Sequence, residues 1–151
     1  MIELLGRSRL VSELLRAGLE VAVPARDRGV DLITYVDLES DVESFIARPI
    51  QMKAASSAQF SISKKYARVR GLILAFVWHL EDPARAVTLA LTYPEALTIG
   101  DKMGWTKTAS WLDHGSYGTT RPSQRLQDLL SPYKMTPSSW WTKVVGTMKR
   151  K

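Results

Sequence analysis

Apolar residues recur along the first part of the chain at two different spacings. Between residues 2 and 17, leucine and valine return every three or four positions, which predicts a helix that ends before Gly18. Further along, the apolar residues alternate, are β-branched or form short continuous runs, and each such segment predicts a strand. These five segments are residues 20–24, 30–36, 45–54, 71–80 and 86–93.

The remaining pattern predicts three more helices, over residues 61–69, 94–103 and 123–130, the last with Ser123 as its N-cap. We therefore expect an α/β or α+β fold, in which helices flank a mixed central β-sheet. Residues 1–95 would form its core. Residues 96–151, which are basic and rich in aromatic residues, would form a C-terminal extension that packs on this core.

Composition narrows the classes of protein to which the chain could belong. There is no cysteine, which excludes disulfides and cysteine-ligated zinc sites. No apolar run reaches the roughly 18 residues that a membrane span requires. The N-terminus lacks the pattern of a secretory signal, because Glu3, Arg7 and Arg9 interrupt its apolar residues. We therefore expect a cytoplasmic protein with no membrane partner.

The net charge of +6 is unevenly distributed. Residues 102–151 have a net charge of +7, whereas residues 1–101 have a net charge of −1. This asymmetry favours a polyanionic partner such as nucleic acid, although a basic tail that only aids solubility would give the same charge. Lys64, Lys65 and Arg68 could likewise bind nucleic-acid phosphates or form a solvated helix face.

Three polar residues are expected to meet at one place in the sheet. Asp31 begins the strand predicted over 30–36, and Gln51 and Lys53, two apart on the next strand, share one face. If these strands pair antiparallel across the acidic turn 37–43, Asp31 and Gln51 come together. Carboxylate and amide oxygens suit Mg²⁺ or Mn²⁺, and the carbonyl of Met52 could add a third oxygen. Lys53 would then lie beside a phosphate.

The segment PARDRGVDL, residues 24–32, followed by IQMK, residues 50–53, resembles the PD-(D/E)XK nuclease superfamily, in its restriction-endonuclease-like and Holliday-junction-resolvase-like branches. The resemblance spans residues 6–93. It implies a restriction-endonuclease-like core and Mg²⁺-dependent hydrolysis of DNA by a homodimer or higher oligomer. Asp31 and Gln51 would be the metal ligands and Lys53 the catalytic cation.

Two positions depart from the family pattern. Gln51 stands where the family usually has a second acid, so its oxygen would bind a metal without contributing charge. Arg7 stands where many members have a glutamate on the first helix. Glu3 lies on about the same helical face as Arg7, whereas Glu13 lies roughly 120° around the helix. The alternative is therefore a catalytically decayed nuclease fold that binds nucleic acid or a protein partner.

Several other residues have two interpretations each. Asp27 could belong to the site, but a turn before a glycine is the simpler role. His79 and His114 are expected at the surface or in capping positions, and Tyr66 in the core rather than on a phosphate or base. Trp105 and Trp111 are expected to anchor the C-terminal segment. Trp140 and Trp141 could stack on bases, join an oligomer contact or pack back on the domain.

Overall fold

The computed structural model describes residues 1–36 and 44–146. Helix α1 (Ile2–Arg16) opens the chain and buries Gly6, Leu10 and Leu14 on one face. The helix ends as predicted, because Gly18 adopts a φ of 86° that favours glycine. The predicted acidic turn, 37–43, lies outside the described residues.

A five-stranded sheet forms the centre of the molecule, in the order β1-β2-β3-β5-β6. The pairing of β3 with β5 is parallel, and the other three pairings are antiparallel. The expected mixed sheet is therefore present, and all five strand predictions overlap its strands. These strands are β1 (Glu20–Ala22), β2 (Leu32–Tyr35), β3 (Ala47–Ala54), β5 (Ile73–Trp78) and β6 (Val87–Thr92).

A second sheet has two antiparallel strands, β4 (Phe60–Ser63) and β7 (Ser116–Thr119). The helix predicted over 61–69 is wrong at its start, because Phe60 and Ile62 alternate with serines and bury their side chains as a strand does. Only Lys64–Arg68 is helical, as the 3₁₀ helix η1.

Four further α-helices follow along the described chain. Helix α2 (Tyr93–Lys102) begins with a capping box formed by Thr92 and Glu95. Ser123 caps α4 (Gln124–Leu130) as predicted. Sequence patterns did not predict α3 (Ala109–His114) or α5 (Pro137–Val145), nor the 3₁₀ helices η2 (Trp105–Lys107) and η3 (Ser131–Tyr133).

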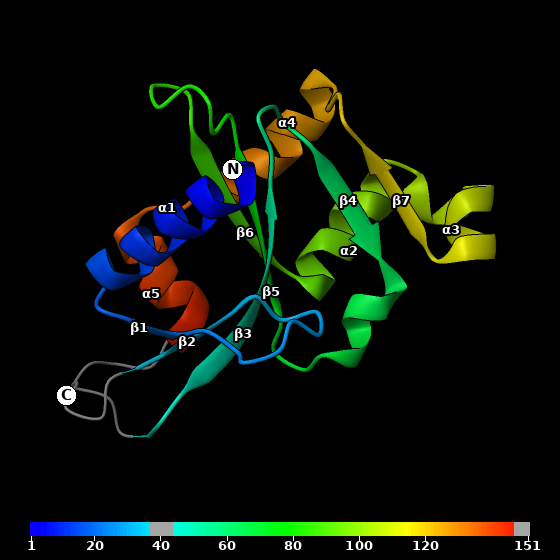
Figure 1. The fold of residues 1–151 in the computed structure, drawn as a ribbon. Helices are drawn as coiled ribbons and strands as arrows, with labels where there is room; N and C mark the ends of the chain where they lie inside the picture. The colour runs from blue at the N-terminus through cyan, green and yellow to red at the C-terminus, as the bar shows by residue number, and fades with distance from the viewer. Residues whose placement is uncertain (37–43, 147–151) are drawn as a thin grey trace.

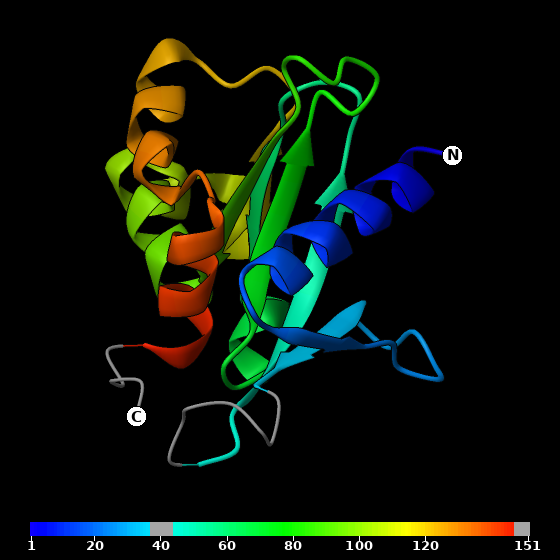
Figure 2. The ribbon, with the colours of Figure 1, turned by 90° about the vertical axis from the view of Figure 1, so that its left-hand side faces the viewer.

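The central sheet lies between two apolar clusters. Helices α1 and α5 pack in the cluster on one face, and Figure 2 shows α1 in front of the sheet with α5 to its left; α2, α4 and the two-stranded sheet lie on the other face (Figure 1). All six residues of β5 are buried, and they alternate between the two clusters. No helix in the described ranges is long and apolar enough to cross a membrane.

The tryptophans are distributed between these clusters. Trp105, Trp111 and Tyr66 belong to the cluster beneath α2, so their predicted core roles are confirmed. Trp140 is completely buried against α1 and the sheet, and Trp141 packs against the same cluster. Of the three interpretations of this pair, the structure therefore shows the one in which it packs back on the domain.

Candidate metal centre where β2 and β3 diverge

Asp31 lies where β2 separates from β3. The two strands pair antiparallel with Leu32 opposite Ile50, and the Asp31 N–H donates to the Ile50 carbonyl over 2.8 Å. Strand β3 continues beyond this point without β2 beside it. The Met52 N–H on that open side donates to Asp31 Oδ2 over 2.7 Å. The expected antiparallel pairing is therefore present, and it holds the Asp31 carboxylate directly beside Gln51 and Met52.

Gln51 carries a buried oxygen that has no donor among the described residues. Its Oε1 atom is shielded from solvent and accepts no hydrogen bond from any described residue, and it is the one such side-chain atom in the described ranges. The turn at Gly29 lies over it, since a Cβ built on Gly29 would be 3.9 Å from this oxygen. An amide oxygen buried without a partner costs about 1–3 kcal/mol, which a water, a ligand or a bound ion at this position would recover.

The surroundings of Asp31 disfavour its charged form. Burial is the largest cause that raises the pKa of Asp31, and the negative charges of Asp27 and Glu3 raise it further. The hydrogen bond from Met52 and the positive charge of Arg7 act in the opposite direction but do not outweigh them. A cation bound here would remove this penalty, because it would offset the charges that raise the pKa.

Helix α1 reaches this site because it lies unusually close to β3. A Cβ on Gly6 would be 2.6 Å from the Cβ of Ala54, so only glycine allows this approach. Glu3 and Arg7 flank Gly6 and act on the charge of Asp31. Glu13 is held elsewhere, where it accepts hydrogen bonds from Thr88 and Trp140. Of the two glutamates considered, Glu3 is therefore the one near Asp31.

Lys53 lies on the same face of β3 as Gln51, two residues further along. The cross-strand partners of these two residues are Phe76 and Leu74, which belong to the cluster beneath α2. The Lys53 ammonium is 5.7 Å from the centre of the Tyr66 ring, and a cation over an aromatic face is stabilised there. The structure therefore gives Lys53 a supported position about 7 Å along the strand from Gln51.

The other candidate residues lie around this centre or away from it. Lys64, Lys65 and Arg68 are exposed on η1, and the Lys65 ammonium is 5.2 Å from the centre of the Tyr66 ring. Asp27 accepts a hydrogen bond from the Gly29 N–H, which makes it a turn residue, as expected. His79 lies in a turn with a φ of 57°, and the exposed His114 ends α3.

The donors at this centre fit a hard divalent cation, although weakly. The Gln51 Oε1 atom accepts no hydrogen bond from the described residues, and Asp31 has a second carboxylate oxygen. The Met52 carbonyl faces the open side of β3 with its N–H. However, no group of three or more His, Cys, Asp or Glu residues in the described ranges could hold a metal. Asp31 is the acid that would bind directly here.

Sequence reasoning missed one part of the site, the two-stranded sheet β4–β7. This sheet lines a hollow together with Lys53, through Ser61 and Ser63 of β4 and Ser116 of β7. The alternation of Phe60, Ser61 and Ile62 was the signal that could have revealed β4.

The chain matches no protein-family model, and neither a curated protein nor a solved structure is significantly similar to it.

Proposed function

We propose that this protein is a metal-dependent endonuclease that hydrolyses phosphodiester bonds of DNA with Mg²⁺ or Mn²⁺. The single observation that carries the proposal is the buried Oε1 of Gln51, which has no hydrogen-bond donor among the described residues and belongs to the residue before Met52, whose N–H donates to the buried carboxylate of Asp31. Lys53 supports it, because its ammonium projects from the same face of β3 and has no ion-pair partner among the described residues.

Each residue has a distinct task in this proposal. Asp31 and Gln51 would hold the cation, and the Met52 N–H fixes the carboxylate of Asp31. When bound, a divalent cation polarises a phosphate and provides hydroxide near neutral pH. The Lys53 ammonium, supported by Tyr66, would bind the phosphate oxygens and stabilise the negative charge that develops on them.

Nicking of DNA tests this function directly. Supercoiled and branched DNA are incubated with the protein and Mg²⁺ or Mn²⁺, beside Lys53→Ala and a matched control, Lys134→Ala, which removes an exposed lysine in the segment before α5. We expect Lys53→Ala to lose about 100-fold or more in rate, because one preformed charge contact to the transition state is removed. Lys134→Ala should keep the wild-type rate. Equal residual rates in the wild type and Lys53→Ala would contradict the proposal.

A second candidate function is a decayed nuclease fold that binds nucleic acid without cutting it. The positive charge of Arg7, which acts on the charge of Asp31, is the observation that favours it, since Arg7 then takes the place of the metal. Arg7→Glu separates the two candidates. If Arg7 replaces the metal, this variant gains Mn²⁺-dependent nicking that the wild type lacks.

The oligomeric state of the proposed enzyme follows from the need to cut two strands. Two strands require two sites, so we propose a homodimer or a higher oligomer. Sedimentation velocity at several protein concentrations, with and without a DNA duplex, measures this state. A protein that stays monomeric on DNA would instead nick one strand at a time.

A further inference from the structure

The two-stranded sheet β4–β7 has an outer face without large side chains. On β4, Phe60 and Ile62 point into the core, so Ser61 and Ser63 lie on the opposite face. Their partners on β7 are Gly118 and Ser116. The strands approach so closely that a Cβ on Gly118 would be 2.7 Å from the Cβ of Ser61, which requires glycine. This face is therefore made of hydroxyls and backbone.

Two neighbouring hollows run across this face. One, with a volume of about 360 Å³, contains Lys53, Lys65 and Tyr117. The next, of about 430 Å³, continues to Thr119 and Thr120. Both are lined by Ser61 and Gly118, so together they form one track, which we call the ribbon groove. The ribbon groove begins at the proposed catalytic lysine and leads away from it.

The chemistry of the ribbon groove suits an anion. No aspartate or glutamate of the described chain lines either hollow. The ammonium groups of Lys53 and Lys65 are 5.7 and 5.2 Å from the centre of the same ring, that of Tyr66. The only ion pairs within residues 1–36 and 44–146 are Arg9–Glu13 and Lys143–Glu95, so neither of these two lysines is paired with a described acid.

We propose that the ribbon groove binds the backbone phosphates of one nucleic-acid strand that leads away from Lys53. Ammonium, hydroxyl and backbone N–H groups are the usual partners of phosphate oxygens. Ser61 and Ser63 are two residues apart, about 7 Å along β4, a spacing close to that between neighbouring phosphates of an extended strand. This inference rests on the proposed function, because it assigns the path of the substrate from the same lysine.

Binding without metal tests the ribbon groove. Fluorescence anisotropy of a labelled oligothymidylate in EDTA compares the wild type with Ser61→Asp, Ser116→Asp and Lys65→Ala. Ser138→Asp, on α5 at the other side of the molecule, makes the same charge change on an exposed serine and is the control (Figure 1). We expect each of the three variants to bind about tenfold more weakly, with a salt slope about 0.7 smaller for each phosphate that is no longer neutralised. Ser138→Asp should bind as the wild type does.

The outcomes separate the ribbon groove from the catalytic proposal. Thermal unfolding of each variant shows whether it is folded, and Lys65→Ala, at an exposed position, keeps the test valid if an aspartate variant does not fold. Equal weakening by the three groove variants and by Ser138→Asp would overturn the groove, as would a wild type that does not bind at low salt. Groove-dependent binding without any nicking would leave the groove in place and contradict the proposed function. If the wild type nicks DNA and the groove variants nick it equally well, the proposed function stands and the ribbon groove is contradicted.

Discussion

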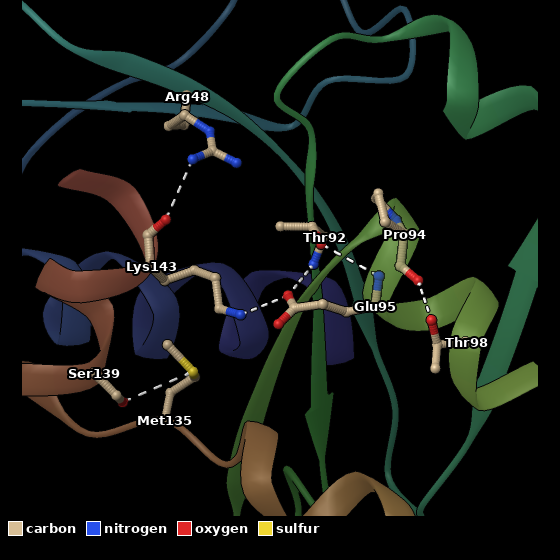
Figure 3. Close-up of polar contacts among 8 residues, drawn as sticks. All are labelled: Arg48, Thr92, Pro94, Glu95, Thr98, Met135, Ser139 and Lys143. Atoms are coloured by element: carbon tan, nitrogen blue, oxygen red, sulfur yellow. Dashed lines mark hydrogen bonds and ion pairs between the residues drawn. The ribbon is translucent and has the colours of Figure 1, made fainter. Parts of the chain in front are cut away.

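Two carboxylates beside the central sheet, those of Glu95 and Asp31, have opposite environments. Glu95 accepts hydrogen bonds from the Lys143 ammonium over 2.6 Å and from the Thr92 N–H over 2.8 Å (Figure 3). Burial alone would raise the pKa of Glu95, but these partners lower it overall. Asp31 has a single hydrogen-bond donor among the described residues, and burial together with Asp27 and Glu3 raises its pKa. Glu95 is therefore stabilised as a charged group, whereas Asp31 is not.

The difference separates an acid whose charge the fold stabilises from one whose charge the fold leaves unfavourable. Glu95 joins the first turn of α2 to α5, and Arg48 on β3 donates to the Lys143 carbonyl over 3.2 Å, so the same region also satisfies a carbonyl near the end of α5 (Figure 3). A hollow of about 810 Å³ lies beside Glu95, but the charges there already neutralise each other. The centre at Asp31 and Gln51 instead leaves a buried oxygen without a donor among the described residues, which is the condition that a cation would relieve.

The largest effect on stability is expected from Glu95→Ala. This change removes the reciprocal bond of the α2 capping box and leaves the mostly buried Lys143 ammonium without its acid. We expect a loss of about 2 kcal/mol in the free energy of unfolding, measured by urea denaturation.

Glu81→Ala is the matched control, because Glu81 is exposed in the turn after β5. It should cost under about 0.5 kcal/mol. If Glu95→Ala were equally mild, the ion pair with Lys143 would contribute nothing to stability. The claim that Glu95, unlike Asp31, stabilises the fold would then be wrong.

The next largest effect on stability is expected from Gln51→Glu, which places a second carboxylate at this centre. A second carboxylate beside Asp31 should cost about 1–2 kcal/mol without metal at neutral pH, because two like charges then share a poorly solvated site. Mn²⁺ should reverse the loss, with a gain of about 2.7 kcal/mol when its concentration is 100 times the Kd. Thermal unfolding with and without Mn²⁺ measures both changes.

Gln127→Glu, at an exposed position on α4, makes the same chemical change away from the site. Its stability should not respond to Mn²⁺ more than that of the wild type. A Gln51→Glu protein that is as stable as the wild type and indifferent to Mn²⁺ would mean that Gln51 does not face a cation site.

Local patterns predicted most of the central sheet and the first helix. The leucine spacing of α1 and the glycine that follows it are visible in the sequence. They predict the helix and its end, where Gly18 adopts a positive φ. The strand β7 is different, because it is stabilised by β4, which lies far away along the chain. Helix α5 is short and begins at Pro137, and burial of Trp140 against α1 is what stabilises it. Such long-range contacts are not visible in a local pattern.

The candidate centre was predictable in its residues but not in its electrostatics. Asp31 and Gln51 were expected to meet if the two strands on either side of the acidic segment paired antiparallel, and the strands do pair in this way. Which glutamate of α1 lies near Asp31 depends on the close approach at Gly6, a feature of tertiary structure. The lack of a donor to Gln51 Oε1 among the described residues, and the turn at Gly29 that lies over this atom, are likewise features of tertiary structure.

The smallest effect, on the pH dependence of stability, compares the two acids directly. The pKa of Asp31 is raised from 3.8 in the folded protein, so its contribution is most favourable below that pH and is lost as the pH rises through the folded pKa. The pKa of Glu95 is lowered from 4.5, so its contribution is full above that pH and is lost as the pH falls through the folded pKa. The contributions of the two acids to the free energy of unfolding therefore change with pH in opposite directions.

Urea unfolding of Asp31→Asn and Glu95→Gln across the acidic range separates these slopes. Asp31→Asn should remove the decline in stability that accompanies rising pH, and Glu95→Gln should remove the loss that accompanies falling pH. Glu13, whose pKa burial also raises, contributes the same sign as Asp31 and remains in both variants, so part of the decline persists. An unchanged profile in Asp31→Asn would show that its carboxyl is solvated as an ordinary acid is. The site would then lack the unfavourable charge that makes a cation its natural partner.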